Sequence, residues 1–221
     1  MTNIKNNLEE INKNLKSIDL ANKVTLVAVS KQQSIDKIIQ AIHFGQKIFG
    51  ENYLQEAIEK IELLKEHKLE WHFIGPIQSN KCKLIAENFS WVHTVDRLKI
   101  ARRINEAREN MSPINICIQI NISQEDTKSG LLLDDLDNFA DELKTYDNLK
   151  IRGLMAIPSN SLNDEKLTIE FNLLRDKYEI MKKKYLSMDT LSMGMSNDYL
   201  LAIKNGSNLV RIGSKIFGKR T

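Results

Sequence analysis

The chain has 221 residues, of which 42% are hydrophobic and 28% charged, so we expect a globular protein with a sizeable core and not a disordered chain. The net charge of +3 is too small to predict nucleic-acid binding, and no apolar segment is long enough to cross a membrane. The two cysteines, Cys82 and Cys117, predict neither a disulfide framework nor a metal site, and they fit a reducing cytoplasm.

Residues 3–18 open the chain with a predicted amphipathic helix, because Ile4, Leu8, Ile11 and Leu15 recur on one helical face. After this helix, short apolar runs alternate with helical patterns along the whole chain. The predicted strands are 24–30, 47–50, 71–74, 91–95, 114–122, 149–157, 190–193 and 209–212. A helix or a helical turn follows each of them.

Strict alternation of strands and helices predicts a parallel sheet in an α/β fold. Eight such units match a (β/α)₈ TIM barrel, preceded here by an extra N-terminal helix. Because no Pro/Gly/Ser-rich linker divides the chain, we expect residues 1–221 to form a single barrel domain. A doubly wound open sheet is the structural alternative.

The stretch 24–31 reads VTLVAVSK and places a lysine at the end of a buried strand. Ligands of parallel α/β folds bind at the carboxyl ends of the strands, so Lys31 is predicted to face a ligand site. A lysine held partly out of water loses proton affinity and becomes a nucleophile for an aldehyde. A surface lysine in a strand-to-helix loop is the alternative.

Two loops near the C-terminus have the composition of a phosphate site. Residues 192–198 read SMGMSND and follow the seventh predicted strand, and residues 210–214 read VRIGS at the end of the eighth. Barrels often bind phosphate between these two loops, where glycine lets backbone N–H groups approach an anion and serine adds a donor. Two tight turns without a ligand are the alternative. Arg211 is a permanent cation that could pair with a carboxylate or face a ring nitrogen.

Seven motifs occur in order and together resemble one family. They are AVSK at 28–31, FGENYLQE at 49–56, WHFIGPIQSNK at 71–81, KSG at 128–130, RGLMAI at 152–157, SMGMSND at 192–198 and VRIGSKIFG at 210–218. With them the chain resembles the pyridoxal phosphate homeostasis protein family, whose fold is similar to the barrel domain of alanine racemase. The resemblance covers nearly the whole chain.

The resemblance implies that the chain binds pyridoxal 5′-phosphate as a Schiff base, the internal aldimine, on Lys31. Ser196, Gly213 and Ser214 would hold the phosphate, and Arg211 would face the pyridine nitrogen. The resemblance also assigns three further residues to cofactor binding: Asn52, His72 and Met193. His72 could equally be a core histidine whose hydrogen bonds are satisfied. Asn208 and Ser214 stand where the family often has threonine, and both keep a polar group.

By this resemblance the expected function is a non-catalytic carrier or buffer of the cofactor in vitamin B6 and amino-acid homeostasis, with pyridoxal phosphate-dependent apo-enzymes as possible partners. A pyridoxal phosphate-dependent amino-acid racemase is the alternative. A third possibility is a barrel enzyme for another phosphorylated metabolite, which the ordered motifs disfavour. We expect Lys128, in the loop after the fifth predicted strand, to lie near the cofactor entrance, and a solvated loop lysine is the alternative of equal weight.

Racemisation needs a second base opposite the lysine. The barrel takes up nearly all 221 residues, which leaves little chain for the extra domain that helps alanine racemase to place its tyrosine base. The tyrosines here fall in helices or at helix ends, so an inefficient racemase at most is expected.

Overall fold

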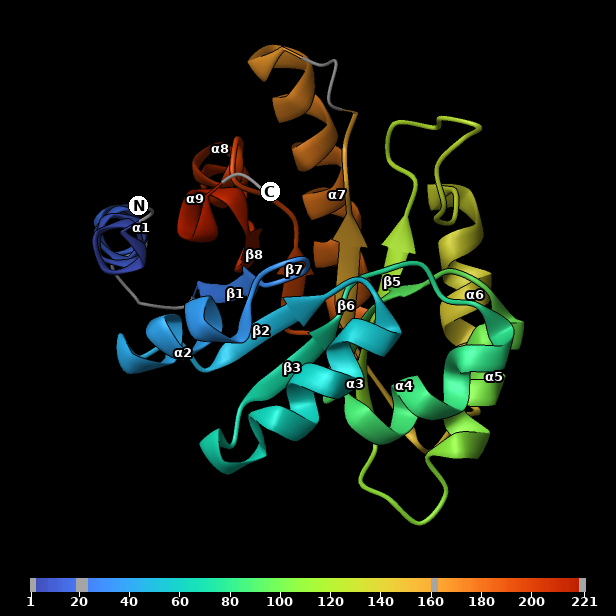
Figure 1. Cartoon of the computed structure of the whole chain (residues 1–221). Coiled ribbons are helices and arrows are strands. Elements are labelled where there is room, and N and C mark those ends of the chain that lie inside the picture. Colours follow the sequence, from blue (N-terminus) through green and yellow to red (C-terminus); the bar gives the residue numbers. More distant parts are fainter. Residues whose placement is uncertain (1–2, 19–23, 160–162, 219–221) are drawn as a thin grey trace.

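The computed structural model describes residues 3–18, 24–159 and 163–218. Within them, parallel strands pair in chain order and close into a barrel (Figure 1). The strands are β1 (Thr25–Val29), β2 (Ile48–Glu51), β3 (Glu70–Phe73), β4 (Trp91–Val95), β5 (Ile114–Ile120), β6 (Leu149–Ala156), β7 (Thr190–Ser192) and β8 (Leu209–Ile212). The predicted (β/α)₈ TIM barrel is confirmed.

Closure depends on the pairing of the first and last strands. Thr25 of β1 lies opposite Leu209 of β8, and Ala28 lies opposite Ile212. An open doubly wound sheet would leave both strands as edges, so this register excludes it. The outer ends of the predicted domain, residues 1–2 and 219–221, lie outside the described residues.

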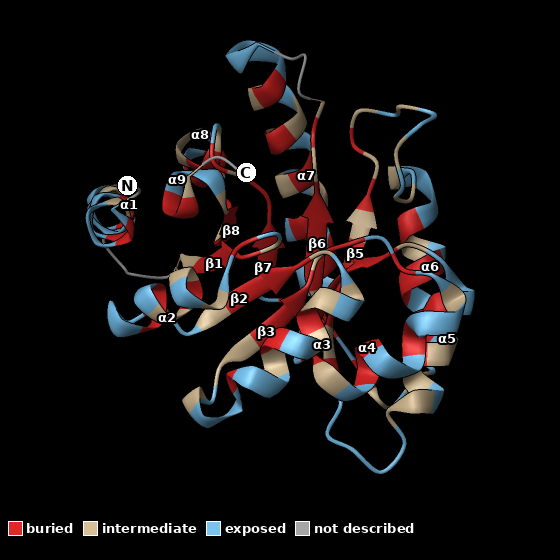
Figure 2. Ribbon diagram, viewed as in Figure 1, coloured by how far each residue is buried: buried red, intermediate tan, exposed pale blue. Residues whose placement is uncertain are grey.

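Helices surround the barrel and bury one face each against it, while the strands form the continuous buried centre (Figure 2). The helices are α1 (Ile4–Ile18), α2 (Ile35–His43), α3 (Leu54–Leu63), α4 (Cys82–Asn88), α5 (Leu98–Ala107), α6 (Leu136–Leu143), α7 (Asp164–Lys184), α8 (Tyr199–Lys204) and α9 (Ser214–Phe217). Short 3₁₀ turns occur at Lys65–His67, Ser79–Lys81 and Leu133–Asp135. No helix of the described segments has the length and apolar character needed to cross a bilayer.

Several strand ends differ from the sequence prediction, and two of these differences bear on the site. The predicted strand 114–122 ends at Ile120 in the structure. The backbone N–H of Asn121 no longer pairs with a neighbouring strand, because it donates to the carbonyl oxygen of Leu131 at 2.9 Å. Strand β2 continues through Glu51, whose side chain is fully buried. A charged residue argues against a buried strand position unless it has partners inside the protein, and Glu51 has such partners.

The extra helix α1 supports the elements that follow β7 and β8. It packs against α2, α8 and α9 with its apolar face buried (Figure 1). Two side-chain amides add specific bonds: Asn7 Nδ2 donates to the Ile216 carbonyl oxygen at 2.9 Å, and Asn14 Nδ2 donates to the Tyr199 hydroxyl at 3.0 Å. The helix therefore braces the short helices that flank the candidate anion site.

Candidate functional site

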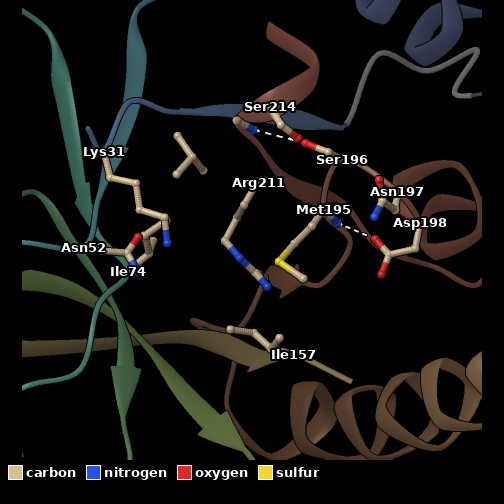
Figure 3. A pocket seen from close by; sticks show the side chains of 12 residues that line it. Lys31, Asn52, Ile74, Ile157, Met195, Ser196, Asn197, Asp198, Arg211 and Ser214 are labelled. Carbon is tan, nitrogen blue, oxygen red and sulfur yellow. Dashed lines mark hydrogen bonds between the residues drawn. The ribbon is translucent and has the colours of Figure 1, made fainter. Parts of the chain in front are cut away.

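A pocket of about 250 Å³ lies at the carboxyl ends of the strands. It is lined by Val29, Lys31, Asn52, Ile74, Ile157, Met195, Ser196, Asn197, Asp198, Arg211, Gly213 and Ser214. These residues come from the ends of β1, β2, β3, β6, β7 and β8 or from the loops that follow them. Figure 3 shows Lys31 and Asn52 on one side, Ser196 and Ser214 on the other, and Arg211 between them.

Lys31 is half-buried in the turn after β1, and both of its neighbours in the chain are held firmly. The Ser30 N–H donates to the Gly50 carbonyl oxygen at 3.0 Å, and the Ser30 hydroxyl donates to Glu51 Oε1 at 2.7 Å. On the other side, the Gln32 N–H donates to Glu56 Oε1 at 2.6 Å. The backbone that carries Lys31 is thus attached to β2 and α3.

A buried lysine organises these contacts. Lys60 Nζ donates to the Ser30 carbonyl oxygen at 2.7 Å, to Glu51 Oε1 at 2.8 Å and to Glu56 Oε1 at 2.6 Å. These three bonds use the three protons of the ammonium group. Burial raises the pKa of Glu51, while Lys60 and the Ser30 hydroxyl act in the opposite direction. We call Ser30, Glu51, Glu56 and Lys60 the lysine-loop cluster.

The opposite side of the pocket is built mainly from backbone. Ser196 Oγ lies 3.4 Å from the Gly213 nitrogen and 3.4 Å from the Lys215 nitrogen, so one hydroxyl and two N–H groups converge there. A Cβ added at Gly213 would lie 3.1 Å from the Val29 carbonyl oxygen, which is closer than ordinary contact. Glycine thus keeps this turn close to β1, and the grouped donors suit an anion.

The loop after β7 is shaped by its glycine and its aspartate. Gly194 has a φ of +95°, and a Cβ there would lie 2.6 Å from the Cβ of Ala202. Asp198 Oδ1 accepts a hydrogen bond from the Met195 N–H at 2.5 Å. These contacts turn the chain so that residues 195–198 line the pocket.

Arg211 is 4% exposed and lies in β8 between the two sides. Its NH1 donates to the Ser192 carbonyl oxygen at 2.8 Å and to Ser192 Oγ at 2.6 Å, and its NH2 donates to the Ala156 carbonyl oxygen at 3.0 Å. Burial lowers the pKa of Arg211 to about 10, which still leaves the guanidinium charged at neutral pH. The pocket therefore has a fixed cation at its inner wall.

The remaining lining residues suit a flat, partly polar ligand. Val29, Ile74 and Ile157 supply apolar surface beside Arg211. Asn52 Oδ1 is buried and has no hydrogen-bond partner among the described residues. A buried amide oxygen without a partner is costly, so a ligand or water that donates to it would stabilise the site.

Most of the residues that the sequence singled out meet in this pocket: Lys31, Asn52, Ser196, Arg211, Gly213 and Ser214. The other two, Met193 and His72, do not line it. Met193 is fully buried in the core, and its carbonyl oxygen accepts from Ser207 Oγ at 2.7 Å, so the pocket begins two residues later, at Met195.

His72 lies inside the barrel and away from this pocket. It contacts Glu70 and His93, and it lines a separate hollow at the opposite, N-terminal end of the strands. Side chains alternate along a strand, and that of His72 points into the barrel. Because His72 lies within β3 and not after its end, it cannot reach the pocket at the carboxyl ends of the strands. The alternative of a satisfied core histidine describes it correctly.

Sequence reasoning missed several residues that shape the site. Met195, Asn197 and Asp198 line the pocket, and their position next to Ser196 in the SMGMSND motif was the available signal. The lysine-loop cluster gave a weaker signal. Glu56 and Lys60 have the spacing of a helical ion pair, but nothing local to them points toward Ser30.

A second hollow adjoins the pocket and contains Lys128. It shares Asn52, Ile74 and Ile157 with the main pocket. Lys128 Nζ lies 2.8 Å from Glu125 Oε1 and donates to the Pro158 carbonyl oxygen at 3.1 Å. The side chain is therefore held between its own loop and the loop that follows β6, at the same end of the barrel as Lys31. In the described part of the chain, no group of three His, Cys, Asp or Glu side chains could hold a metal ion.

Comparison with known proteins agrees with this geometry. The protein-family model for the alanine racemase N-terminal domain matches residues 2–221 of the sequence. The pyridoxal phosphate homeostasis protein of Vibrio cholerae serotype O1 is 44% identical over 230 residues, covering 100% of this chain and 98% of that protein. The protein of the same name from Escherichia coli strain K12 is 47% identical over 204 residues, covering 89% and 86%.

A solved structure of PipY from Synechococcus elongatus PCC7942, with PLP bound, superimposes with a TM-score of 0.88 at 31% sequence identity, covering 98% of this chain and 100% of that one. The sequence relatives and this structure match the chain along nearly its full length. The chain therefore belongs to the pyridoxal phosphate homeostasis protein family, built on the alanine racemase N-terminal domain.

Proposed function

We propose that this chain binds pyridoxal 5′-phosphate reversibly and serves as a carrier or buffer of that cofactor. The observation that carries the proposal is the arrangement of one pocket, in which the Lys31 amine and an anion-binding turn face each other across a buried arginine (Figure 3). Relatives that are 42–48% identical are named for pyridoxal phosphate homeostasis, and PipY was solved with PLP bound.

Each lining residue has a defined task in this proposal. Lys31 binds the aldehyde carbon covalently, and Ser196 with the Gly213 and Ser214 turn holds the phosphate. Arg211 faces the ring nitrogen and keeps it unprotonated, because a fixed cation opposes a second positive charge. Asn52 offers its unpaired amide oxygen to a hydrogen-bond donor of the ligand. When bound, the cofactor supplies an aldehyde for amines and an electron-withdrawing ring.

A carrier role is favoured over racemisation by what faces Lys31. Of the five tyrosines, all of which the structure describes, none lines the pocket. The carboxylate that does line it, Asp198, already accepts the Met195 N–H. Racemisation needs a base on each side of the substrate carbon, and among the residues that line the pocket the one candidate besides Lys31 is this engaged Asp198.

The wider setting of the proposal follows from the same features. Pyridoxal phosphate-dependent apo-enzymes are the proposed recipients of the cofactor. The two free, buried cysteines fit the reducing cytoplasm. We also propose that residues 1–221 act as one cofactor-binding domain, since β1 and β8, near the two ends of the chain, pair to close the barrel.

The lysine assignment is tested by absorption spectroscopy of the purified protein loaded with the cofactor. Lys31→Ala should abolish the visible band, and hydride reduction followed by peptide mapping should find the pyridoxyl group on the Lys31 peptide of the wild type. Lys83→Ala is the matched control, because the Lys83 side chain is 78% exposed on α4 and far from the pocket lining. A normal band in Lys31→Ala would refute the assignment.

The racemase alternative is tested separately by exchange at the α-carbon of alanine in heavy water. The carrier proposal expects no interconversion of D- and L-alanine at ordinary enzyme rates, on the order of one per second or more. Exchange at such rates that depends on Lys31 would favour the racemase.

A further inference from the structure

A continuous line of hydrogen-bonded side chains crosses the barrel interior and ends at Arg211. Glu70 Oε1 lies 2.7 Å from His72 Nε2, and His72 Nδ1 lies 2.9 Å from His93 Nε2. His93 Nδ1 lies 3.0 Å from Ser192 Oγ, which in turn accepts from Arg211 NH1 at 2.6 Å. These residues come from β3, β4, β7 and β8, so the line joins opposite walls of the barrel. We call it the interior chain.

The two ends of the interior chain determine the direction of every bond within it. A guanidinium can only donate, so Ser192 Oγ accepts from Arg211 and its own proton is available to His93 Nδ1. An ionised carboxylate can only accept, so His72 donates from Nε2 to Glu70 and leaves Nδ1 as an acceptor. His93 then donates from Nε2 to His72. All bonds run from Arg211 toward Glu70, and both imidazoles are neutral.

The surroundings of the interior chain agree with this direction. His72 is 1% exposed and His93 0%, and burial lowers the pKa of both, that of His93 well below its ordinary value. The bond to His72 lowers the pKa of Glu70, which is consistent with an ionised acceptor.

The other titratable groups lie at the two ends of the interior chain. Arg152 and its ion-pair partner Asp189 line the hollow beside Glu70. Cys117 and Asp198 lie near Arg211, and burial raises the pKa of the Cys117 thiol to about 12, so it is a neutral neighbour. None of these groups supplies a negative charge in the middle of the interior chain that would reverse its bonds.

We propose that His93 and Ser192 are positioning residues for Arg211, and that the carboxylate of Glu70, at the far end of the barrel, determines the direction of the bonds that hold the guanidinium. The inference rests on the proposed function, because its purpose is to orient Arg211 toward the ring nitrogen of the cofactor. With NH1 committed to Ser192 and NH2 to Ala156, the remaining guanidinium donors are left for the pocket.

Glu70 is the exposed end of the interior chain, with its side chain 45% exposed in the hollow at the N-terminal end of the strands, whereas the other end, Arg211, lines the pocket. A change at Glu70 therefore acts on Arg211 without touching the cofactor pocket. This separates the interior chain from residues that line the pocket, whose replacement alters ligand contacts directly.

The direction of the bonds is tested without cofactor, by ¹⁵N NMR of the four histidine side chains in the ligand-free protein. We expect two neutral Nε2–H tautomers, from His72 and His93, that do not titrate between about pH 5.5 and 8. His43, which is exposed, and His67, which is half-buried, lie outside the interior chain and provide the comparison signals. A proton on Nδ1 of His93 would overturn the inference.

The role of Glu70 is tested in the same experiment. Glu70→Ala removes the terminal acceptor and should convert the single tautomer of each buried histidine into a mixture. Glu66→Ala is the matched control, because Glu66 is an exposed carboxylate on the 3₁₀ turn that precedes β3. Unchanged tautomers in Glu70→Ala would show that the direction is not determined from this end, and would overturn the inference.

The consequence for Arg211 is tested with the loaded protein. Ser192→Ala removes one oxygen and should shift the pH midpoint of the visible absorption band by about half a pH unit or more, because the guanidinium loses an acceptor. Ser207→Ala removes another buried hydroxyl, which contacts the Met193 carbonyl oxygen, and should leave the midpoint unchanged. An unchanged midpoint in Ser192→Ala would overturn the inference. Absence of a Lys31-dependent band in the wild type would instead refute the proposed function.

Discussion

The two sides of the pocket are built from different materials. The lysine side depends on buried charges, because Lys60 holds the Ser30 carbonyl oxygen and the carboxylates of Glu51 and Glu56. The anion side depends on backbone N–H groups, one hydroxyl and the absence of a side chain at Gly213. The proposed covalent attachment point and the proposed anion site thus place different demands on the chain.

The difference follows from what each side has to hold. A lysine side chain is long and flexible, so contacts to its backbone have to fix its position. These contacts come from buried charged groups, which need partners of opposite charge. An anion needs several donors at close range, and backbone N–H groups supply them without an additional charge. Damage to the lysine side should therefore lower stability, whereas damage to the anion side should lower selectivity for phosphate.

The largest effect is expected from Lys60→Met on the lysine side. The substitution leaves Glu51 fully buried without its cation, and losing one partner of a buried pair costs about 3–5 kcal/mol. Urea unfolding of the ligand-free protein measures this loss. Glu51→Gln is the matched variant and should cost less, because Glu56 still pairs with Lys60. A loss below about 1 kcal/mol for Lys60→Met, the range of exposed pairs, would contradict the buried role.

The anion side is tested by Gly213→Val. The added side chain meets the Val29 carbonyl oxygen, so the turn has to move and its N–H groups leave the position proposed to hold the phosphate. Affinity for pyridoxal phosphate should fall at least about tenfold, or about 1.4 kcal/mol, while affinity for pyridoxal changes little. Spectroscopic titration with both ligands measures the ratio. An equal loss for both would assign Gly213 to folding and not to anion binding.

The pH dependence of stability should also distinguish the two sides. Because burial raises the pKa of Glu51 above its usual 4.5, the folded state binds this proton more tightly than the unfolded state. The contribution of Glu51 to stability is therefore present at low pH and is lost as the pH rises through its folded pKa. Relative to the wild type, Glu51→Gln should become more stable as the pH rises from 4.5, and then level off.

The matched control for this pH series is Ser196→Ala, which changes the anion side and removes no titrating carboxyl group. Its difference in unfolding free energy from the wild type should be constant over the same pH range. Urea unfolding at several pH values measures both variants. A Glu51→Gln difference that falls with rising pH would show that Lys60 outweighs the burial of Glu51.

The smallest effect on stability is expected from Lys128→Ala, in the hollow that adjoins the pocket. Lys128 is paired with Glu125 at 2.8 Å in the hollow that adjoins the lysine side, and such partly exposed pairs contribute little to stability. Stability should change little, whereas the rate of cofactor transfer to an apo-enzyme should change if the lysine side extends to this loop. An unchanged rate and affinity would make Lys128 a solvated loop residue. Lys144→Ala is the control, because Lys144 follows α6 directly and forms a comparable ion pair with Asp141.

Much of the architecture could be predicted because its signals are local. Buried parallel strands appear as short apolar runs, and the strand-to-helix alternation along the chain predicted the barrel. Lys31, Ser196 and Gly213 could be found for the same reason, since each lies just after a strand whose end was readable. His72 and Met193 show the limit of this reasoning, because membership of a motif does not tell how deep in the barrel a side chain lies.

Local sequence therefore determined the order of the elements, the class of fold and the residues at the strand ends. Tertiary structure alone decided the rest, because the deciding contacts join distant residues. Closure needed β1 beside β8, the lysine-loop cluster needed Lys60 beside Ser30, and the interior chain needed His93 beside Ser192, 99 positions away. A polar side chain that must leave water is compatible with many partners, and only the folded barrel selects one of them.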